Sequence, residues 1–177
     1  MLRFPKGTVG VDYDAIRRTA DGVDVLAESD RRDVLLVTVG PMAGIGLKVA
    51  ERLEAQGIGA TVVDPRWVVP VPGSVIELAR DHRIVVSLED GIRVGGIGTR
   101  IRQDLREAGV DTAVTEIGLP DEFLEHGSRA DILERVGLTP QHIARDVTAM
   151  VLGSKLPHAR GAGLEQVSSD TSPQPRF

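Results

Sequence analysis

The chain has 177 residues, of which 41% are apolar and 27% are charged, and this is the composition of one globular domain of ordinary size. It contains no cysteine, which excludes disulfides, thiolate metal sites and cysteine nucleophiles. A formal net charge of -5 and an aromatic content of 3% disfavour nucleic acid as a partner. Because the apolar runs are far shorter than a membrane span and no signal-peptide core is visible, we expect a cytoplasmic protein without membrane contact.

Residues 1–32 are interpreted as a lead-in segment that ends with a short strand. The Val and Leu content of residues 23–27 favours a strand, and a charged turn at 28–32 joins it to an apolar strand at 33–39. Two strands separated by a short loop are most simply antiparallel. The sequence therefore predicts a hairpin that adds one antiparallel edge strand to the sheet.

From residue 33 onward, apolar strands alternate with amphipathic helices. Further strands are predicted at 59–63, 83–88 and 112–117, and helices around Met42–Leu53, Ser74–Arg80, Ser128–Val136 and Pro140–Val151. After the loop at 91–98, Ile101 and Leu105 mark the face of another helix, which ends near Ala108 and Gly109. This alternation predicts a three-layer α/β domain over residues 33–151. It has about five strands, mostly parallel, with helices on both faces of the sheet.

Three helix ends carry recognisable signals. Ser74, followed by Glu77 three residues later, has the pattern of a capping box. Thr139 before Pro140 is a favourable N-cap, and His82 ends a helix, where the helix dipole favours a partly positive imidazole. Residues 152–177 are rich in Gly, Ser and Pro without periodicity, so we expect a disordered tail there.

Two glycine-rich loops each follow a predicted strand. The first, at 40–46, fails the dinucleotide-binding pattern because Val49 stands where a glycine is needed, so we interpret it as a tight turn. In the second, Glu89 and Asp90 precede glycines 95–98 at the carboxyl end of a strand, where open α/β sheets place ligands. These carboxylates could act as a base or hold a metal. We favour the interpretation that Glu89 or Asp90 binds loop amides and that the glycines allow close packing.

Other polar residues give weaker signals. Arg3 and Lys6 flank a proline and form a plausible phosphate contact, although surface charge is the simpler interpretation. Trp67, beside Arg66, could make a cation–π contact or anchor an interface, or could belong to a rigid, partly buried connection. No catalytic or metal-binding spacing involves any of the four histidines, which are His82, His126, His142 and His158.

Taken together, five segments resemble the C-terminal, transketolase-like domain of the 1-deoxy-D-xylulose-5-phosphate synthase family, in particular its actinobacterial branch. The resemblance covers residues 1 to about 151. The segments occur in the same order as in the family, and they are R-F-P-K-G at 3–7, D-P-R-W-V-V-P-V at 64–71, L-E-D-G at 88–91 with G-G-I-G at 95–98, I-G-L-P-D-E-F at 117–123, and E-H-G-S at 125–128 running into L-T-P at 138–140.

The resemblance implies a reaction that this chain does not perform alone. The family's full enzyme condenses pyruvate with glyceraldehyde 3-phosphate, releases carbon dioxide, uses thiamine diphosphate and magnesium, and works as a homodimer that supplies isoprenoid, thiamine and pyridoxal biosynthesis. The cofactor sites and catalytic residues belong to two preceding domains. We therefore expect this chain to hold no catalytic, cofactor-binding or metal-binding residue, to be inactive by itself, and to support the remaining domains and the dimer.

One family site does fall within this chain. The second basic residue of the R-F-P-K-G segment binds the phosphate of glyceraldehyde 3-phosphate in the family, and it corresponds to Lys6, with Arg3 nearby. Lysine supplies a cation at this position, but not the two-pronged hydrogen bonding of arginine.

Two other interpretations stay open at this stage. The same domain occurs in transketolases and in the beta subunit of 2-oxo acid dehydrogenases, although the segments at 3–7 and 119–123 argue against both. The chain could also be a non-catalytic binding or interaction module. The sequence is compatible with a truncated gene, a split enzyme or an excised domain.

Overall fold

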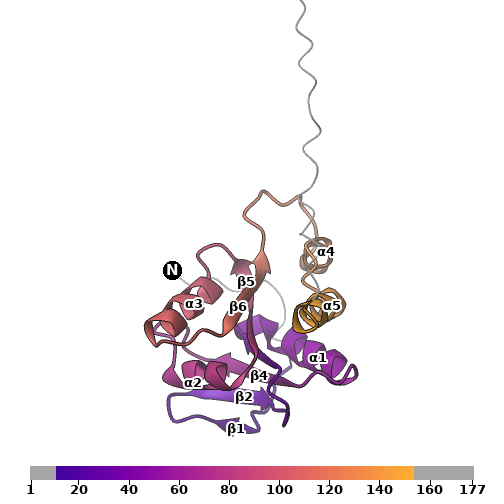
Figure 1. Ribbon diagram of the computed structural model, residues 1–177. Coiled ribbons are helices and arrows are strands. Elements are labelled where there is room, and N and C mark those ends of the chain that lie inside the picture. Colours follow the sequence, from indigo (N-terminus) through magenta and orange to yellow (C-terminus); the bar gives the residue numbers. More distant parts are fainter. Residues whose placement is uncertain (1–10, 154–177) are drawn as a thin grey trace, which may run out of the picture.

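The structure is a computed structural model that describes residues 11–153 (Figure 1). In this part of the chain, the strands are β1 (Arg17–Arg18), β2 (Val23–Ala27), β3 (Val34–Thr38), β4 (Ala60–Pro65), β5 (Ile84–Ile92) and β6 (Ala113–Leu119). A short 3-10 turn (Gly40–Met42) precedes the first of the helices, which are α1 (Ala43–Glu54), α2 (Gly73–Asp81), α3 (Ile97–Glu107), α4 (Arg129–Arg135) and α5 (Pro140–Val151). The predicted phosphate contacts Arg3 and Lys6, and the predicted tail beyond residue 153, lie outside the described residues.

The strands form one mixed sheet in the order β1-β2-β4-β3-β5-β6. Strand β3 is central and parallel to both β4 and β5, and β6 is parallel to β5. Strand β2 runs antiparallel to β4, with Asp24 opposite Asp64, and the two-residue strand β1 is antiparallel to β2. The prediction of a mostly parallel sheet with an antiparallel side is confirmed.

The predicted hairpin between residues 23–27 and 33–39 is wrong. Both edges of β3 are occupied by parallel neighbours, so β2 pairs instead with the outer edge of β4. An antiparallel partner on β3 would leave that edge of β4 without backbone hydrogen bonds, which is costly. The short loop at 28–33 therefore does not join neighbouring strands.

Helices cover both faces of the sheet, as predicted. Helices α1 and α5 lie on one face and helices α2 and α3 on the other (Figure 1). Consecutive residues of β3 alternate between the two cores, since Leu36 packs against the first pair of helices and Leu35 against the second. Both side chains are fully buried. This explains why the strand is apolar at every position.

The helix N-termini show one correct and one wrong prediction. The Thr139 hydroxyl accepts a hydrogen bond from the His142 amide at 3.4 Å, as expected for an N-cap. The capping box at Ser74 is absent because helix α2 already begins at Gly73, with Pro72 as its N-cap residue. The Asp21 carboxylate caps this helix instead, accepting hydrogen bonds from the Ser74 amide at 2.8 Å and the Ser74 hydroxyl at 2.7 Å.

The charge predicted for His82 is also wrong. The side chain is only 4% exposed, and this burial lowers the pKa of His82 below its ordinary value of 6.5. Its Nδ1 lies 2.7 Å from the Leu78 carbonyl oxygen and its Nε2 lies 3.0 Å from the Thr61 hydroxyl. A carbonyl only accepts, so Nδ1–H donates to Leu78. Because burial disfavours the charged ring, Nε2 is left as the acceptor of a hydrogen bond from the Thr61 hydroxyl.

We predict that Asp21→Ala destabilises the protein by about 1 kcal/mol at neutral pH, because helix α2 loses its cap. Burial opposes ionisation of Asp21, but hydrogen bonds from Thr19 and Ser74 outweigh it and lower the pKa from 3.8 to about 2. Stability from a carboxyl with a lowered pKa is present above pH 3.8 and is lost as the pH falls toward 2. Urea unfolding of both proteins between pH 7 and pH 2 measures the difference.

The exposed Asp30 provides the control, because Asp30→Ala removes an aspartate without removing a helix cap. An unfolding difference between the wild type and Asp21→Ala that stays constant over this pH range would contradict the assignment of Asp21 as the cap.

Candidate functional site

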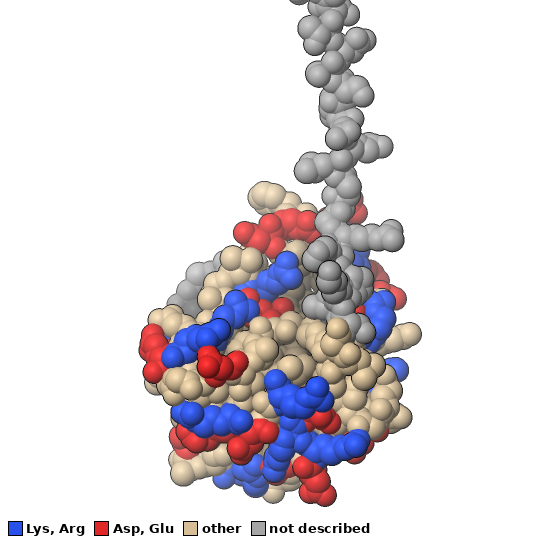
Figure 2. Space-filling model, in the orientation of Figure 1, with Lys and Arg blue, Asp and Glu red and all other residues tan. Residues whose placement is uncertain are grey.

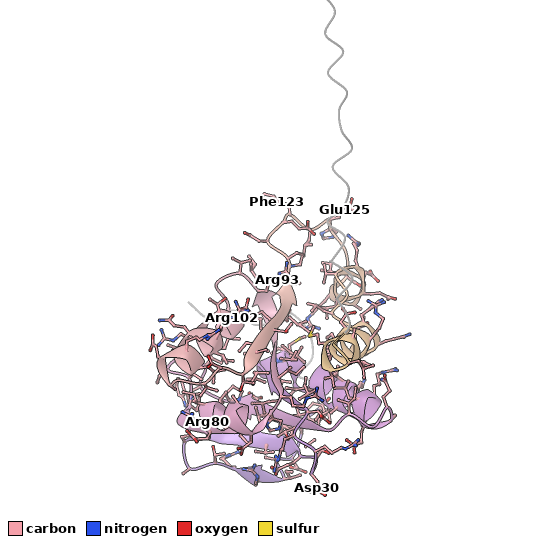
Figure 3. All side chains as sticks on the ribbon, viewed as in Figure 1. Asp30, Arg80, Arg93, Arg102, Phe123 and Glu125 are labelled. Carbon is pink, nitrogen blue, oxygen red and sulfur yellow. The ribbon has the colours of Figure 1, made fainter. Side chains whose placement is uncertain are left out.

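The four parallel strands end at one side of the molecule, which we call the carboxyl rim. It consists of the loops that follow β3, β4, β5 and β6, at residues 39–42, 66–72, 93–96 and 120–128. Open α/β sheets bind ligands at this position. The segments at 64–71, 88–98 and 117–128 therefore all reach this rim. Figure 3 shows Arg93, Phe123 and Glu125 at this end of the molecule.

Glu89 holds the start of helix α3. Its carboxylate accepts hydrogen bonds from the amides of Ile97 at 3.2 Å and Gly98 at 3.4 Å, and the residue is 8% exposed. The interpretation that this acid binds loop amides is confirmed. Burial raises the pKa of Glu89 above 4.5, and the charge of Glu116 adds to this effect, while the two amide hydrogen bonds oppose it. Glu89 is thus an anchor of α3 rather than a free base.

The glycines around Glu89 allow β5, β6 and α3 to approach closely, as the sequence indicated. A Cβ atom on Gly98 would collide with the Ser87 hydroxyl and would lie 2.5 Å from Cγ of Glu116. A Cβ on Gly96 would collide with the Glu89 carboxylate. Packing against β5 and β6 therefore explains Gly96 and Gly98, and a positive φ of 74° explains Gly95, with no bound ligand needed.

Asp90 has a different role from its neighbour. Its carboxylate lies 2.9 Å from Nη2 of Arg129, the first residue of α4, so the ion pair ties the end of β5 to that helix. Glu89 and Asp90 are thus each engaged within the chain and do not converge. Among residues 11–153 there is also no cluster of three or more His, Asp or Glu side chains suited to a metal. These residues do not fit a magnesium–diphosphate site.

A cavity of about 590 Å³ opens at the carboxyl rim beside the Asp90–Arg129 pair. Its walls come from the ends of β3 and β5, the loop after β6, and helix α4, and they are lined by Val39, Pro41, Glu89, Asp90, Gly91, Leu119, Leu124, Gly127, Arg129, Ile132 and Leu133. Sequence reasoning missed this cavity. The sequence predicted only a helical stretch at Ser128–Val136, and no local pattern there shows that α4 lies beside the carboxyl end of the sheet.

The segment after β4 exposes its tryptophan. Nε of Arg66 lies 3.1 Å from the Asp24 carboxylate, which also pairs with Arg18 on β1. Trp67 is 75% exposed. The interpretation of a partly buried connection therefore fails for Trp67 itself, whereas Val71 of the same loop is buried.

The first described residues also lie beside the carboxyl rim. A Cβ atom on Gly44, near the start of α1, would collide with the Tyr13 hydroxyl, so Tyr13 packs directly on the beginning of that helix. Residues that follow the predicted phosphate-binding segment closely in sequence are thus near the rim. Of the remaining histidines, His142 lies 2.9 Å from the Thr139 hydroxyl and His158 is outside the described residues.

The sequence profile of one family, described as "Transketolase, C-terminal domain", matches residues 24–143. The chain belongs to this family. The match includes nearly all of the sheet from β2 to β6, helices α1 to α4, and the first turn of α5. The fold described above is thus that of a transketolase C-terminal domain.

Relatives support the more specific resemblance drawn from the five segments. Proteins named 1-deoxy-D-xylulose-5-phosphate synthase are 69% identical over 175 residues in Leifsonia xyli subsp. xyli and 73% identical over 160 residues in Clavibacter sepedonicus. These alignments cover 99% and 90% of this chain, but only 26% and 25% of the relatives. The chain thus spans about a quarter of the length of these relatives, and the predicted resemblance is confirmed.

Solved structures agree with this fold. A structure described as "Split gene transketolase, inactive beta4 tetramer" superposes with a TM-score of 0.70 at 30% identity, covering 80% of this chain and 46% of that one. A transketolase mutant from Pichia stipitis superposes with a TM-score of 0.59 at 18% identity, over 87% of this chain and 22% of that one, and shows the fold alone. No helix among residues 11–153 is both long and apolar enough to cross a membrane.

Proposed function

We propose that this transketolase C-terminal domain is part of a 1-deoxy-D-xylulose-5-phosphate synthase, an enzyme that condenses pyruvate with glyceraldehyde 3-phosphate and releases carbon dioxide. The observation that carries the proposal is the identity of 69–73% with relatives of that name over 90–99% of the chain. The split-gene transketolase is only 30% identical, which favours a synthase over a transketolase.

Within such an enzyme, this domain supports the others and adds one substrate contact. Thiamine diphosphate and magnesium, which supply the carbanion chemistry on pyruvate, are bound by the preceding domains in this proposal. The engaged carboxylates of Glu89 and Asp90 fit that division of labour. Lys6, with Arg3, binds the phosphate of glyceraldehyde 3-phosphate. The assembled enzyme is a cytoplasmic homodimer.

A chimera tests the proposal directly. The last quarter of the Leifsonia xyli relative is replaced by this chain, and formation of 1-deoxy-D-xylulose 5-phosphate from the two substrates is measured. We expect an active chimera, and no product from the 177-residue chain alone. A second chimera that carries the C-terminal domain of a transketolase is the matched control. A folded, dimeric but inactive chimera would contradict the proposal.

The phosphate contact predicts a selective kinetic effect of Lys6→Ala in the chimera. Loss of one charge-assisted hydrogen bond is expected to raise KM for glyceraldehyde 3-phosphate about tenfold or more, while KM for pyruvate stays the same. Lys6→Arg keeps the cation and should restore most of the affinity. Lys48→Ala, at an exposed position of α1, is the control. An equal rise of both KM values would argue against a phosphate contact.

A further inference from the structure

The carboxyl rim exposes large apolar side chains from three different loops. Trp67 is 75% exposed and Val69 65% in the loop after β4, Val94 is 65% exposed after β5, and Phe123 is fully exposed after β6. Ile92, the last residue of β5, is 51% exposed. Single exposed apolar residues are ordinary, but several large ones on loops at the same end of the sheet point to an interaction surface. Tryptophan and phenylalanine are also the residues that interfaces concentrate.

The opposite side of the sheet, the amino rim, has a different character. Its loops lie at 28–33, 55–59, 82–83 and 108–112. The first of them is rich in charged residues, and Arg83 pairs with Asp33 at 3.3 Å and Arg106 with Asp111 at 2.6 Å. Basic and acidic side chains are interleaved over the lower part of Figure 2, where Figure 3 places Asp30, whereas Phe123 lies at the far end of the molecule. The amino rim therefore has the character of a solvent-exposed surface.

The position of the preceding polypeptide indicates what covers the carboxyl rim. Tyr13 packs on the start of α1 at this rim, so the backbone approaches the domain from the same side as the exposed apolar loops. Relatives are about four times as long as this chain, which covers 26% of the Leifsonia xyli protein. Because the matching family is described as a C-terminal domain, most of the polypeptide of such a relative precedes the region that corresponds to this chain.

We infer that the carboxyl rim is the face on which the preceding part of the synthase docks, with Trp67, Val94 and Phe123 as its anchors. The inference rests on the proposed function and specifies where the partner binds. The cavity beside α4 opens on the same rim and offers apolar walls to a side chain of the partner. Acidic residues flank Phe123, at Asp121 and Glu122, so the facing surface of the partner is basic around an apolar centre.

Hydrogen exchange of backbone amides tests the inference without requiring activity. Exchange is compared between the 177-residue chain and the chimera with the Leifsonia xyli protein. We expect peptides covering 66–72, 93–96 and 120–128 to exchange at least tenfold more slowly in the chimera, and the amino-rim loops to exchange equally in both proteins. Protection at the amino rim instead, or at neither rim, would overturn the inference.

Paired variants identify the anchors. Trp67→Ser combined with Phe123→Ser in the chimera should abolish most of the protection at the carboxyl rim. Leu152→Ser removes an apolar side chain that is 71% exposed at the end of α5, where Arg83 bonds to the Val151 carbonyl at the amino rim, and should leave the protection intact. Equal effects of the two changes would overturn the role of the anchors.

The outcomes separate this inference from the proposed function. An active chimera with an unprotected carboxyl rim overturns the inference and leaves the synthase assignment standing. An inactive chimera with a protected rim overturns the synthase assignment and supports the docking face. Protection that appears in the 177-residue chain alone as its concentration rises would show that a second copy occupies the rim, and would overturn the preceding domain as its occupant.

Discussion

Leu36→Ala and Leu35→Ala are each expected to lower the free energy of unfolding by about 2–5 kcal/mol, which is the usual cost of deleting a buried leucine side chain. Both residues are fully buried in the central strand β3, one under α1 and α5 and the other under α2 and α3. The cost includes the lost transfer free energy and the cavity left behind, because neither helix layer can collapse fully onto the sheet. Urea unfolding of the 177-residue chain measures both effects.

The pair of variants also tests the position of β3. If one face of β3 were exposed to water, the substitution of the leucine on that face would lower the free energy of unfolding only slightly. Leu152→Ala is the control at an exposed leucine, and it should change stability by less than about 0.5 kcal/mol. A small effect at either Leu35 or Leu36 would contradict a sheet that is covered on both faces.

Glu89→Ala is expected to destabilise the protein by about 1–3 kcal/mol, because two buried amides at the start of α3 lose their acceptor. Those amides belong to Ile97 and Gly98. Glu89→Gln retains one oxygen acceptor and should cost less than the alanine variant. Unfolding measurements at neutral pH give the order of the three proteins, and equal stabilities would show that Glu89 does not anchor the helix.

The comparison of Glu89 with Glu89→Gln should also depend on pH. Burial raises the pKa of Glu89 in the folded state above 4.5, so the folded protein holds this proton more tightly than the unfolded chain does. The stability of the wild type relative to Glu89→Gln therefore falls as the pH rises from 4.5 through the folded pKa, and then levels off. A relative stability that rises over this pH range would show that the amide hydrogen bonds, and not burial, have the larger effect on the pKa of Glu89.

Short-range patterns in the sequence predicted most of the fold. The unbroken apolar run of β3 indicated a strand covered on both faces, and helical spacing located α1, α3 and α5. These predictions succeeded because burial on a strand or helix repeats with the local backbone geometry. The acid at Glu89 and the glycines after it were also interpreted correctly, because Glu89 binds amides only eight and nine residues further along the chain.

The errors share one physical cause, which is contact between residues that are distant in sequence. The partner of β2 was decided by the free edge of β4, and the cap of α2 is Asp21, which is 53 residues from Ser74. His82 is neutral because Thr61 and the surrounding core enclose it. A local sequence pattern does not show which distant strand edge, carboxylate or hydroxyl a residue will contact in the folded chain.

By itself, the sequence determined the class of sheet, the helices that cover it and the family to which the chain belongs, since each follows from local periodicity or from ordered motifs. The tertiary structure alone decided which strands are neighbours, that the cavity lies under α4, and that the exposed apolar loops share one rim. Those features arise when loops separated by helices are brought to the same end of a parallel sheet. The parallel direction of β3, β4, β5 and β6 imposes that arrangement, since each strand ends at the same side of the sheet.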